Sequence, residues 1–289
     1  MSKIWLVTGA ARGLGRSIVE AALAAGDRVV ATARNPERLA DLEKAHGGNL
    51  RTFALDVTDA DAARAAIDFT VRTFSGLDVL VNNAGFGQAS PFEQISLEDF
   101  RAQIDVNFYG VVNLTHAALP VLRKQRSGYI INISSSAGRA AIPAMTAYTA
   151  AKWAVGGFTE ALSMEVEALG IKVTAVEPGG LRTEWSSIAS SDMPELLPEY
   201  QESVGNILDA LKNNAGHEIG DPARAAKVVI DLAGRDEVPK HLLLGSDAVR
   251  WVSLTEGARQ KSDTEWKAVS ISTDLSANVD LSHFDRFKG

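Results

Sequence analysis

The chain has 289 residues, of which 46% are hydrophobic and 22% are charged, a composition typical of a globular protein with a large core. Its formal net charge of -7 argues against nucleic acid and an anionic membrane surface as partners. The absence of cysteine excludes disulfides, thiol catalysis and cysteine-bound zinc, and the five histidines lack the spacing of a metal site, so no metal is expected.

Seven short apolar runs rich in Val, Ile and Leu are typical of buried strands. They span residues 4–8, 28–33, 52–57, 79–84, 129–134, 172–177 and 241–246. Segments with helical character lie between them, including 15–26, 61–74, 97–125 and 146–169. This alternation predicts an α/β fold: a Rossmann-type doubly wound parallel sheet of about seven strands with helices on both faces. No linker rich in Pro, Gly or Ser divides the chain, so we expect residues 1–289 to form a single domain.

The first predicted strand runs directly into "TGAARGLG", which places Gly9, Gly13 and Gly15 before a helix. Glycines let a pyrophosphate approach the backbone closely, and the free N–H groups and positive dipole end of the helix attract it. The spacing is not that of the usual G-x-G-x-x-G fingerprint. The context nevertheless predicts a dinucleotide phosphate site.

The second predicted strand ends in "ATARNP", without the acidic residue that would bind the adenosine ribose 2'-hydroxyl of NAD. Arg34 follows this strand and Arg12 lies in the glycine loop, so two guanidinium groups could converge on a 2'-phosphate. The alternative is that either arginine simply coats the surface. We expect the cofactor to be NADP(H).

The stretch "AYTAAK" places Tyr148 and Lys152 four residues apart, on one face of a predicted helix. Because an ammonium group favours phenolate over phenol, Lys152 is expected to lower the pKa of Tyr148 toward a range useful for proton transfer. Three serines, 134–136, end the preceding strand, where ligands of parallel sheets bind. A serine there could hydrogen-bond a carbonyl oxygen that Tyr148 protonates.

Seven motifs, in order, resemble the short-chain dehydrogenase/reductase family over roughly residues 3 to 250. They are "TGAARGLG" (8–15), "LDV" (55–57), "NNAG" (82–85), Asn107 in "DVNFYG", "ISSSAG" (133–138), "YTAAK" (148–152) and "PGGLRT" (178–183). The resemblance implies a catalytic tetrad of Ser135, Tyr148, Lys152 and Asn107, with Ser134 as the less favoured serine. The backbone of Asn107 would hold a water that joins Lys152 to a proton path.

The resemblance also implies a set of cofactor contacts. They are Thr8, Gly9, Arg12, Gly13, Leu14, Gly15, Arg34, Asp56, Val57, Asn83, Ala84, Gly85, Tyr148, Lys152, Pro178, Gly179, Leu181 and Thr183. Asp56 and Val57 would contact adenine, "NNAG" would line the cofactor and brace the sheet, and "PGGLRT" would hold the nicotinamide carboxamide. Asn82 and Asn107 can also be purely structural.

Two regions interrupt the alternation of strand and helix. Residues 184–220 form an insertion that is longer than a strand-to-helix loop requires, with Val204, Ile207, Leu208 and Leu211 on one face of a short amphipathic helix. A substrate lid and a merely packed insertion are the two interpretations. Residues 253–289 exceed the compact core of the family, and we expect them to wrap on the surface as a tail.

These features predict an NADPH-dependent enzyme that interconverts a ketone or aldehyde and its alcohol by hydride transfer. The substrate-facing candidates, chosen by side-chain type, suggest a medium-sized, fairly apolar carbonyl compound. They are Phe86, Gln88, Pro143, Met145 and Trp185. Two alternatives stay open: the nucleotide-sugar epimerase and dehydratase branch, which shares the Tyr-x-x-x-Lys pair, and a non-catalytic NADPH-sensing regulator.

The apolar stretch in the N-terminal "MSKIWLVTGA" is too short for a signal peptide, and no later run approaches the roughly 18 apolar residues that a membrane span needs. We therefore expect a cytoplasmic protein. Tetramers built through the two long helices, 97–125 and 146–169, are common in the family that the sequence resembles, so a homodimer or homotetramer is expected, although the C-terminal tail can cover or create an interface.

Overall fold

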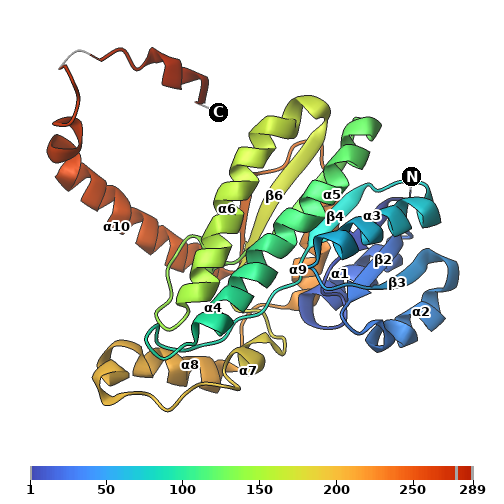
Figure 1. Cartoon of the computed structure of the whole chain (residues 1–289), viewed down its shortest axis with the longest axis horizontal. Helices are drawn as coiled ribbons and strands as arrows, with labels where there is room; N and C mark the ends of the chain where they lie inside the picture. The colour runs from blue at the N-terminus through green and yellow to red at the C-terminus, as the bar shows by residue number, and fades with distance from the viewer. Residues whose placement is uncertain (1, 277–278, 288–289) are drawn as a thin grey trace.

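The computed structural model describes residues 2–276 and 279–287, and within them the chain forms a seven-stranded parallel sheet (Figure 1). Its strands are β1 Ile4–Val7, β2 Arg28–Ala33, β3 Leu50–Ala54, β4 Val79–Asn82, β5 Gly128–Ile133, β6 Ile171–Pro178 and β7 His241–Leu244. The order across the sheet is β3-β2-β1-β4-β5-β6-β7. Because the order reverses between β1 and β4, a crevice is expected beyond their carboxyl ends.

Helices cover both faces of this sheet. The α-helices of the described residues are α1 Gly13–Ala24, α2 Ala40–His46, α3 Ala60–Phe74, α4 Leu97–Ile104, α5 Gly110–Gln125, α6 Thr146–Val166, α7 Trp185–Ala189, α8 Asn206–Asn214, α9 Pro222–Ala233 and α10 Ser246–Ile271. Successive residues of β1 alternate between the faces: Trp5 packs in the cluster that contains α1 and α9, and Leu6 packs with α3, α5 and α6. The predicted doubly wound fold is confirmed.

The third strand is displaced from its predicted position. The apolar pattern predicts residues 52–57, whereas the ladder runs over Leu50–Ala54. Leu55 and Val57, which suggested the later limit, are buried in the turn that follows the strand. The run of apolar residues therefore continues past the last residue of β3. The limits of the other strands differ from their predicted limits by at most two residues.

A π-helical turn interrupts the long helix predicted over 97–125. Asp105–Tyr109 adopts this wider turn and joins α4 to α5. Such turns often mark functional sites, because the wider spacing frees backbone groups from the regular helical ladder. Asn107 lies in the turn and is fully buried. Its Nδ2 donates to the carbonyls of Phe86 and Gln103, each at 2.8 Å.

A buried chain of hydrogen bonds fixes β4 and β5 against the helices behind them. Asn82 Nδ2 donates to Asn132 Oδ1 at 2.8 Å and to Thr115 Oγ1 at 3.1 Å. Asn132 Nδ2 in turn donates to Thr159 Oγ1 at 2.9 Å. All four residues are buried, so each bond satisfies a polar group that water cannot reach. Asn82 thus braces the sheet.

The insertion at 184–220 folds over the lower end of the sheet in Figure 1. It contains α7, a π-helical turn at Gln201–Gly205, and α8. Val204 and Leu208 are buried in one apolar cluster with Met145 and Tyr148, and Leu211 packs against it. The predicted amphipathic face therefore lies on the helix that carries Tyr148.

The C-terminal extension does not wrap on the surface, so that prediction is wrong for the described residues. The extension continues α10, which runs away from the sheet (Figure 1). Val252 is buried, whereas Trp266 is 61% exposed. Beyond its first turns the helix mixes apolar and charged residues without an apolar face that could pack on the body. The parts of the prediction at 277–278 and 288–289 lie outside the described residues.

None of the helices within residues 2–276 and 279–287 has both the length and the apolar character needed to cross a bilayer.

Replacing Asn132 with alanine should lower the free energy of unfolding by about 1–3 kcal/mol, because Asn82 and Thr159 each lose a buried hydrogen-bond partner. Urea unfolding followed by circular dichroism measures this change. Asn49→Ala is the matched control, since Asn49 is exposed. Equal unfolding midpoints for the two variants would contradict a stabilising role for the buried chain.

Candidate active site

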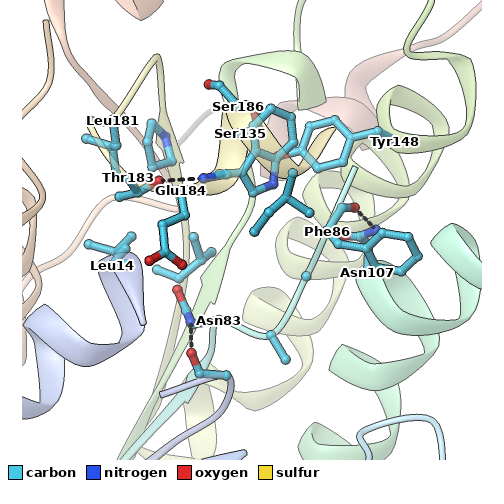
Figure 2. Close-up of a pocket in the computed structure, with 18 of the residues that line it drawn as sticks. Leu14, Asn83, Phe86, Asn107, Ser135, Tyr148, Leu181, Thr183, Glu184 and Ser186 are labelled. Atoms are coloured by element: carbon cyan, nitrogen blue, oxygen red, sulfur yellow. Dashed lines mark hydrogen bonds between the residues drawn. The ribbon is translucent and has the colours of Figure 1, made fainter. Parts of the chain in front are cut away.

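A cavity of about 1030 Å³ lies beyond the carboxyl ends of the strands (Figure 2). Its lining comes from the glycine loop, the ends of β2, β4, β5 and β6, the start of α6, and the insertion. This is the place where open parallel sheets bind ligands, next to the reversal of strand order. The cavity has a cofactor half on the side of the glycine loop and an apolar half under the insertion.

The glycine loop has the shape and the free donors that a pyrophosphate needs. Gly9 has a φ of 63°, and a Cβ there would lie 2.8 Å from the Ala84 Cα. A Cβ on Gly15 would overlap Asn83 Nδ2, so the turn can approach β4 only without side chains at both positions. No side chain caps the first turn of α1, and no acidic residue lies in it. Its N–H groups and helix dipole are therefore available to an anion.

Thr8 holds the loop in place and does not line the cavity, contrary to the predicted cofactor contact. It is almost fully buried. Its Oγ1 accepts the backbone N–H groups of Asn83 and Ala84 at 2.9 and 3.0 Å. Asn83 Nδ2 returns a hydrogen bond to the Thr8 carbonyl at 2.9 Å. The threonine thus acts through Asn83 and Ala84, which do line the cavity.

The end of β2 presents basic side chains and no carboxylate to the cavity. Arg34 and Arg38 both line it beside Ala33. Arg38 lies in a short 3-10 turn after the strand, and sequence reasoning missed it because a single exposed arginine in a loop carries no pattern. The charge of Arg34 contributes to lowering the pKa of the Asp56 carboxyl, although hydrogen bonds from Thr58 are the main cause.

Arg12 reaches across the cavity rather than toward Arg34. Its Nη1 lies 3.8 Å from Glu184 Oε2, in the insertion. Figure 2 shows the Glu184 side chain extending toward Leu14 and the glycine loop. Both charged side chains are largely exposed, so water screens this ion pair and it contributes little to stability. Arg12 is consequently free to rearrange when an anion occupies the cavity.

Ser135 and Tyr148 lie at one wall of the cavity (Figure 2), and Lys152 also lines the cavity there. Lys152 Nζ lies 5.6 Å from the centre of the Tyr148 ring and donates to the Ile133 carbonyl at 2.8 Å. Ser135 Oγ accepts the Ala137 N–H at 3.1 Å, as the cap of a short turn. The alternative serine, Ser134, donates to the Lys152 carbonyl at 3.1 Å. Ser134 therefore anchors α6, which leaves Ser135 as the serine for a substrate.

Burial controls the protonation of this pair. It raises the pKa of Tyr148 to about 12, although the interaction with Ser135 acts in the opposite direction. It lowers the pKa of Lys152 to about 8. The prediction that the tyrosine pKa is lowered is therefore wrong for this structure, because desolvation of the phenolate is the largest effect and raises that pKa. At neutral pH Tyr148 holds its proton and is ready to donate it.

Asn107 lies behind Lys152, close to the end of β4. A Cβ on Gly85 would lie 2.6 Å from Asn107 Oδ1 and 3.5 Å from Lys152 Nζ, so both atoms face Gly85. Gln103, which the sequence did not single out, is fully buried one turn before Asn107. Its Oε1 accepts the N–H of Gln88 at 3.1 Å. Gln88 does not line the cavity, contrary to the predicted substrate contact. The hydrogen bond from its backbone N–H to Gln103 instead holds the chain beside the cavity wall.

The apolar half of the cavity begins at Tyr148. The rings of Tyr148 and Trp185 lie 5.0 Å apart between centroids and are tilted by 53°. Four of the predicted substrate-facing residues line the cavity: Phe86, Pro143, Met145 and Trp185. Apolar lining residues that the sequence did not single out are Ala89, Ile142, Ala144 and Ile188. The helix α8 adds Ile207, Leu208 and Leu211, which the helical periodicity of the sequence had indicated.

The remaining predicted cofactor contacts also line the cavity. They are Gly13, Leu14, Asp56, Val57, Pro178, Gly179, Leu181 and Thr183. Thr183 Oγ1 accepts the N–H of Trp185 at 3.3 Å, which joins the loop from Pro178 to Thr183 to the insertion.

The chain is similar to known proteins in sequence and in fold. The family model for short chain dehydrogenases matches residues 3–194. Oxidoreductase BOA17 of Botryotinia fuckeliana (strain B05.10) is 42% identical over 275 residues, which are 94% of this chain and 100% of that protein. The crystal structure of a short-chain dehydrogenase from Streptomyces avermitilis is 38% identical with a TM-score of 0.88, covering 95% of this chain and 100% of that one.

A third similar protein was solved with its cofactor. The structure of ElxO with NADP bound is 27% identical with a TM-score of 0.72, and the match covers 86% of this chain and 100% of that chain. The seven-stranded parallel sheet agrees with the likeness in fold to these structures. The chain therefore belongs to the short-chain dehydrogenase family of NAD(P)-dependent oxidoreductases.

Proposed function

We propose that the protein is an NADPH-dependent carbonyl reductase that interconverts an apolar ketone or aldehyde and its alcohol. The observation that carries this proposal is the common wall of Ser135, Tyr148 and Lys152, which lies between the cofactor half and the apolar half of one cavity. Membership of an oxidoreductase family supports the reaction class.

The residues of this wall divide the chemistry among them. Bound NADPH supplies the hydride that adds to the carbonyl carbon. Ser135 Oγ donates a hydrogen bond to the carbonyl oxygen and orients it. Tyr148 gives its phenolic proton to that oxygen as negative charge develops there. The Lys152 ammonium then stabilises the phenolate, and the product is an alcohol with one added hydride and one added proton.

The preference for NADP(H) rests on the charges at the end of β2. Ala33 stands where an acid would bind a ribose 2'-hydroxyl, and Arg34 and Arg38 line the cavity beside it. Guanidinium groups suit a 2'-phosphate because their planar donors match its oxygens. The NADP bound to ElxO supports the same preference.

The substrate class follows from the lining of the apolar half. Its walls are aromatic and aliphatic, from Phe86 and Met145 to α8. The basic residues of the lining are Arg12, Arg34, Arg38 and Lys152, and each of them lies in the cofactor half or at the catalytic wall. A substrate carboxylate would be desolvated there without a cationic partner, which is costly. An uncharged, medium-sized apolar carbonyl compound fits best.

Tyr148→Phe should lower kcat by at least about 100-fold, because it removes the proton donor and keeps the ring. NADPH consumption, followed by nicotinamide absorbance with a panel of ketones and aldehydes, measures this change. Tyr109→Phe is the matched control, since Tyr109 is 51% exposed. Comparable turnover by both variants would rule out Tyr148 as the acid.

Replacing Ala33 with aspartate together with Arg34→Ala should shift the NADPH-to-NADH ratio of kcat/KM toward NADH by at least about tenfold, since a charge-assisted bond to the 2'-phosphate is lost. Steady-state kinetics with both cofactors measure the ratio. Arg235→Ala serves as the control, because Arg235 is exposed. An unchanged ratio would sink the assignment of NADP(H).

Neutral ketones should have a kcat/KM at least about tenfold higher than keto acids of the same carbon skeleton, because the apolar half offers a carboxylate no cation. Competition between paired substrates in one assay measures the difference directly. Turnover that favours small charged keto acids over aryl or alicyclic ketones would overturn the assigned substrate class.

A further inference from the structure

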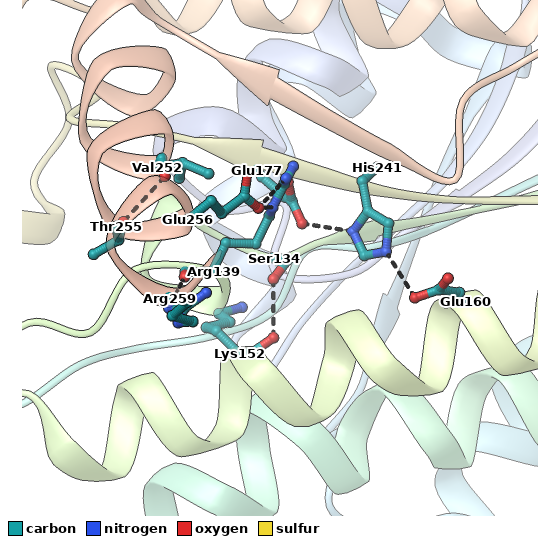
Figure 3. A network of polar contacts seen from close by, with 10 residues as sticks. All are labelled: Ser134, Arg139, Lys152, Glu160, Glu177, His241, Val252, Thr255, Glu256 and Arg259. Atoms are coloured by element: carbon teal, nitrogen blue, oxygen red, sulfur yellow. Dashed lines mark hydrogen bonds and ion pairs between the residues drawn. The ribbon is translucent and has the colours of Figure 1, made fainter. Parts of the chain in front are cut away.

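The side chain of Glu177 is fully buried at the end of β6, directly before the loop that begins at Pro178 (Figure 3). Its carboxylate lies 3.3 Å from Arg139 Nη1 and 2.7 Å from His241 Nδ1. A buried carboxylate requires such partners, because its own desolvation is costly. The hydrogen bond that Glu177 accepts from His241 is also the main cause of the raised pKa of His241. Glu177 thus fixes the position of Arg139.

Arg139 connects this carboxylate to α10. Its Nε donates to Glu256 Oε1 at 2.9 Å, and Arg259, one turn further along α10, donates to the Arg139 carbonyl. The Arg259 guanidinium also stacks over the Trp153 ring at 4.5 Å, next to Lys152 in the sequence. Figure 3 shows α10 and α6 on either side of Arg139. The C-terminal helix therefore contacts Arg139 through both side chain and backbone.

Arg139 closes the turn that presents Ser135. The N–H of Gly138 donates to the Ser135 carbonyl at 2.8 Å, and the N–H groups of Arg139 and Ala140 donate to the Ser136 carbonyl at 3.0 and 2.9 Å. These bonds make residues 135–140 one compact unit. Because Arg139 is part of that unit, holding its guanidinium in place also holds Ser135 against Tyr148.

A second contact from α10 reaches the loop from Pro178 to Thr183. Asp247, in the first turn of α10, accepts the N–H of Gly180 at 2.8 Å through Oδ2. A Cβ on Gly179 would overlap the same carboxylate, so Asp247 is packed directly against this backbone. Gly179 N–H donates to the Leu244 carbonyl at 2.9 Å. The loop that follows Pro178 is thereby tied to the start of α10.

We propose that α10 is a positioning element of the active site. Glu256 holds the Ser135 turn through Arg139, and Asp247 holds the Gly179–Gly180 backbone beside the bound dinucleotide. Neither residue lines the cavity, so both act through the groups that they hold. The Glu256 contact should affect the chemical step, and the Asp247 contact should affect the affinity for the cofactor. The inference rests on the proposed function, because the effect of Glu256 is measured as a change in turnover.

The test compares single variants of the full chain. Glu256→Ala should lower kcat about fivefold and leave the NADPH dissociation constant within about twofold, because a partly exposed ion pair to Arg139 is lost. Asp247→Ala should weaken NADPH binding about fivefold, and Asp247→Asn should restore most of it, since an amide oxygen still accepts the Gly180 N–H. Glu265→Ala, on the exposed part of α10, is the matched control.

Two readouts separate positioning from general destabilisation. Nicotinamide fluorescence gives the NADPH dissociation constant, and hydrogen exchange of peptides covering 135–140 should quicken in Glu256→Ala but not in Glu265→Ala. The proposal would be overturned if Glu256→Ala and Asp247→Ala each lowered kcat and weakened NADPH binding to the same extent. It would also be overturned if neither variant changed kcat or the NADPH dissociation constant. Absence of turnover in the unmodified protein would overturn the proposed function alone, since NADPH binding and hydrogen exchange still decide the role of α10.

Discussion

The approach of the glycine loop to the end of β4 is the contact on which the rest of the site depends. Gly9 and Gly15 let the loop lie against Asn83 and Ala84 without intervening side chains. The same strand end continues into Gly85, which faces Asn107 and Lys152. The glycine loop and Lys152 are therefore positioned by three consecutive residues. A side chain at any of these glycines would separate the two parts of the site.

Burial shifts the pKa of Tyr148 upward and the pKa of Lys152 downward. Both side chains are less than a tenth exposed, and desolvation favours the uncharged form of each. The phenol therefore keeps its proton until charge develops on a nearby oxygen. Lys152 keeps its proton at neutral pH, because burial lowers its pKa only to about 8, and its Nζ donates to the Ile133 carbonyl. The fold thus buries a protonated phenol beside an ammonium group.

Much of this arrangement could be predicted from the sequence, because local patterns carry it. The apolar runs set the strands, and the glycine spacing and the Tyr148–Lys152 pair identify the cavity wall. What the sequence could not give depends on tertiary packing: the exposed path of α10, the hydrogen bond from the Gln88 backbone N–H to Gln103, and the direction of Arg12 toward Glu184. The sign of the Tyr148 pKa shift was missed for the same reason, since motif spacing does not reveal burial.

The π-helical turn at Asp105–Tyr109 also joins the two halves of one long helix. Deleting one residue there would give a regular helix with α4 and α5 still in phase, because a π-helical turn holds one residue more than the α-helical turn that it replaces. Asn107 lies within the turn, so the deletion would move its side chain relative to the carbonyls of Phe86 and Gln103, and the wall beside Phe86 would lose its hydrogen bonds. The segment therefore tolerates substitution more readily than a change in length.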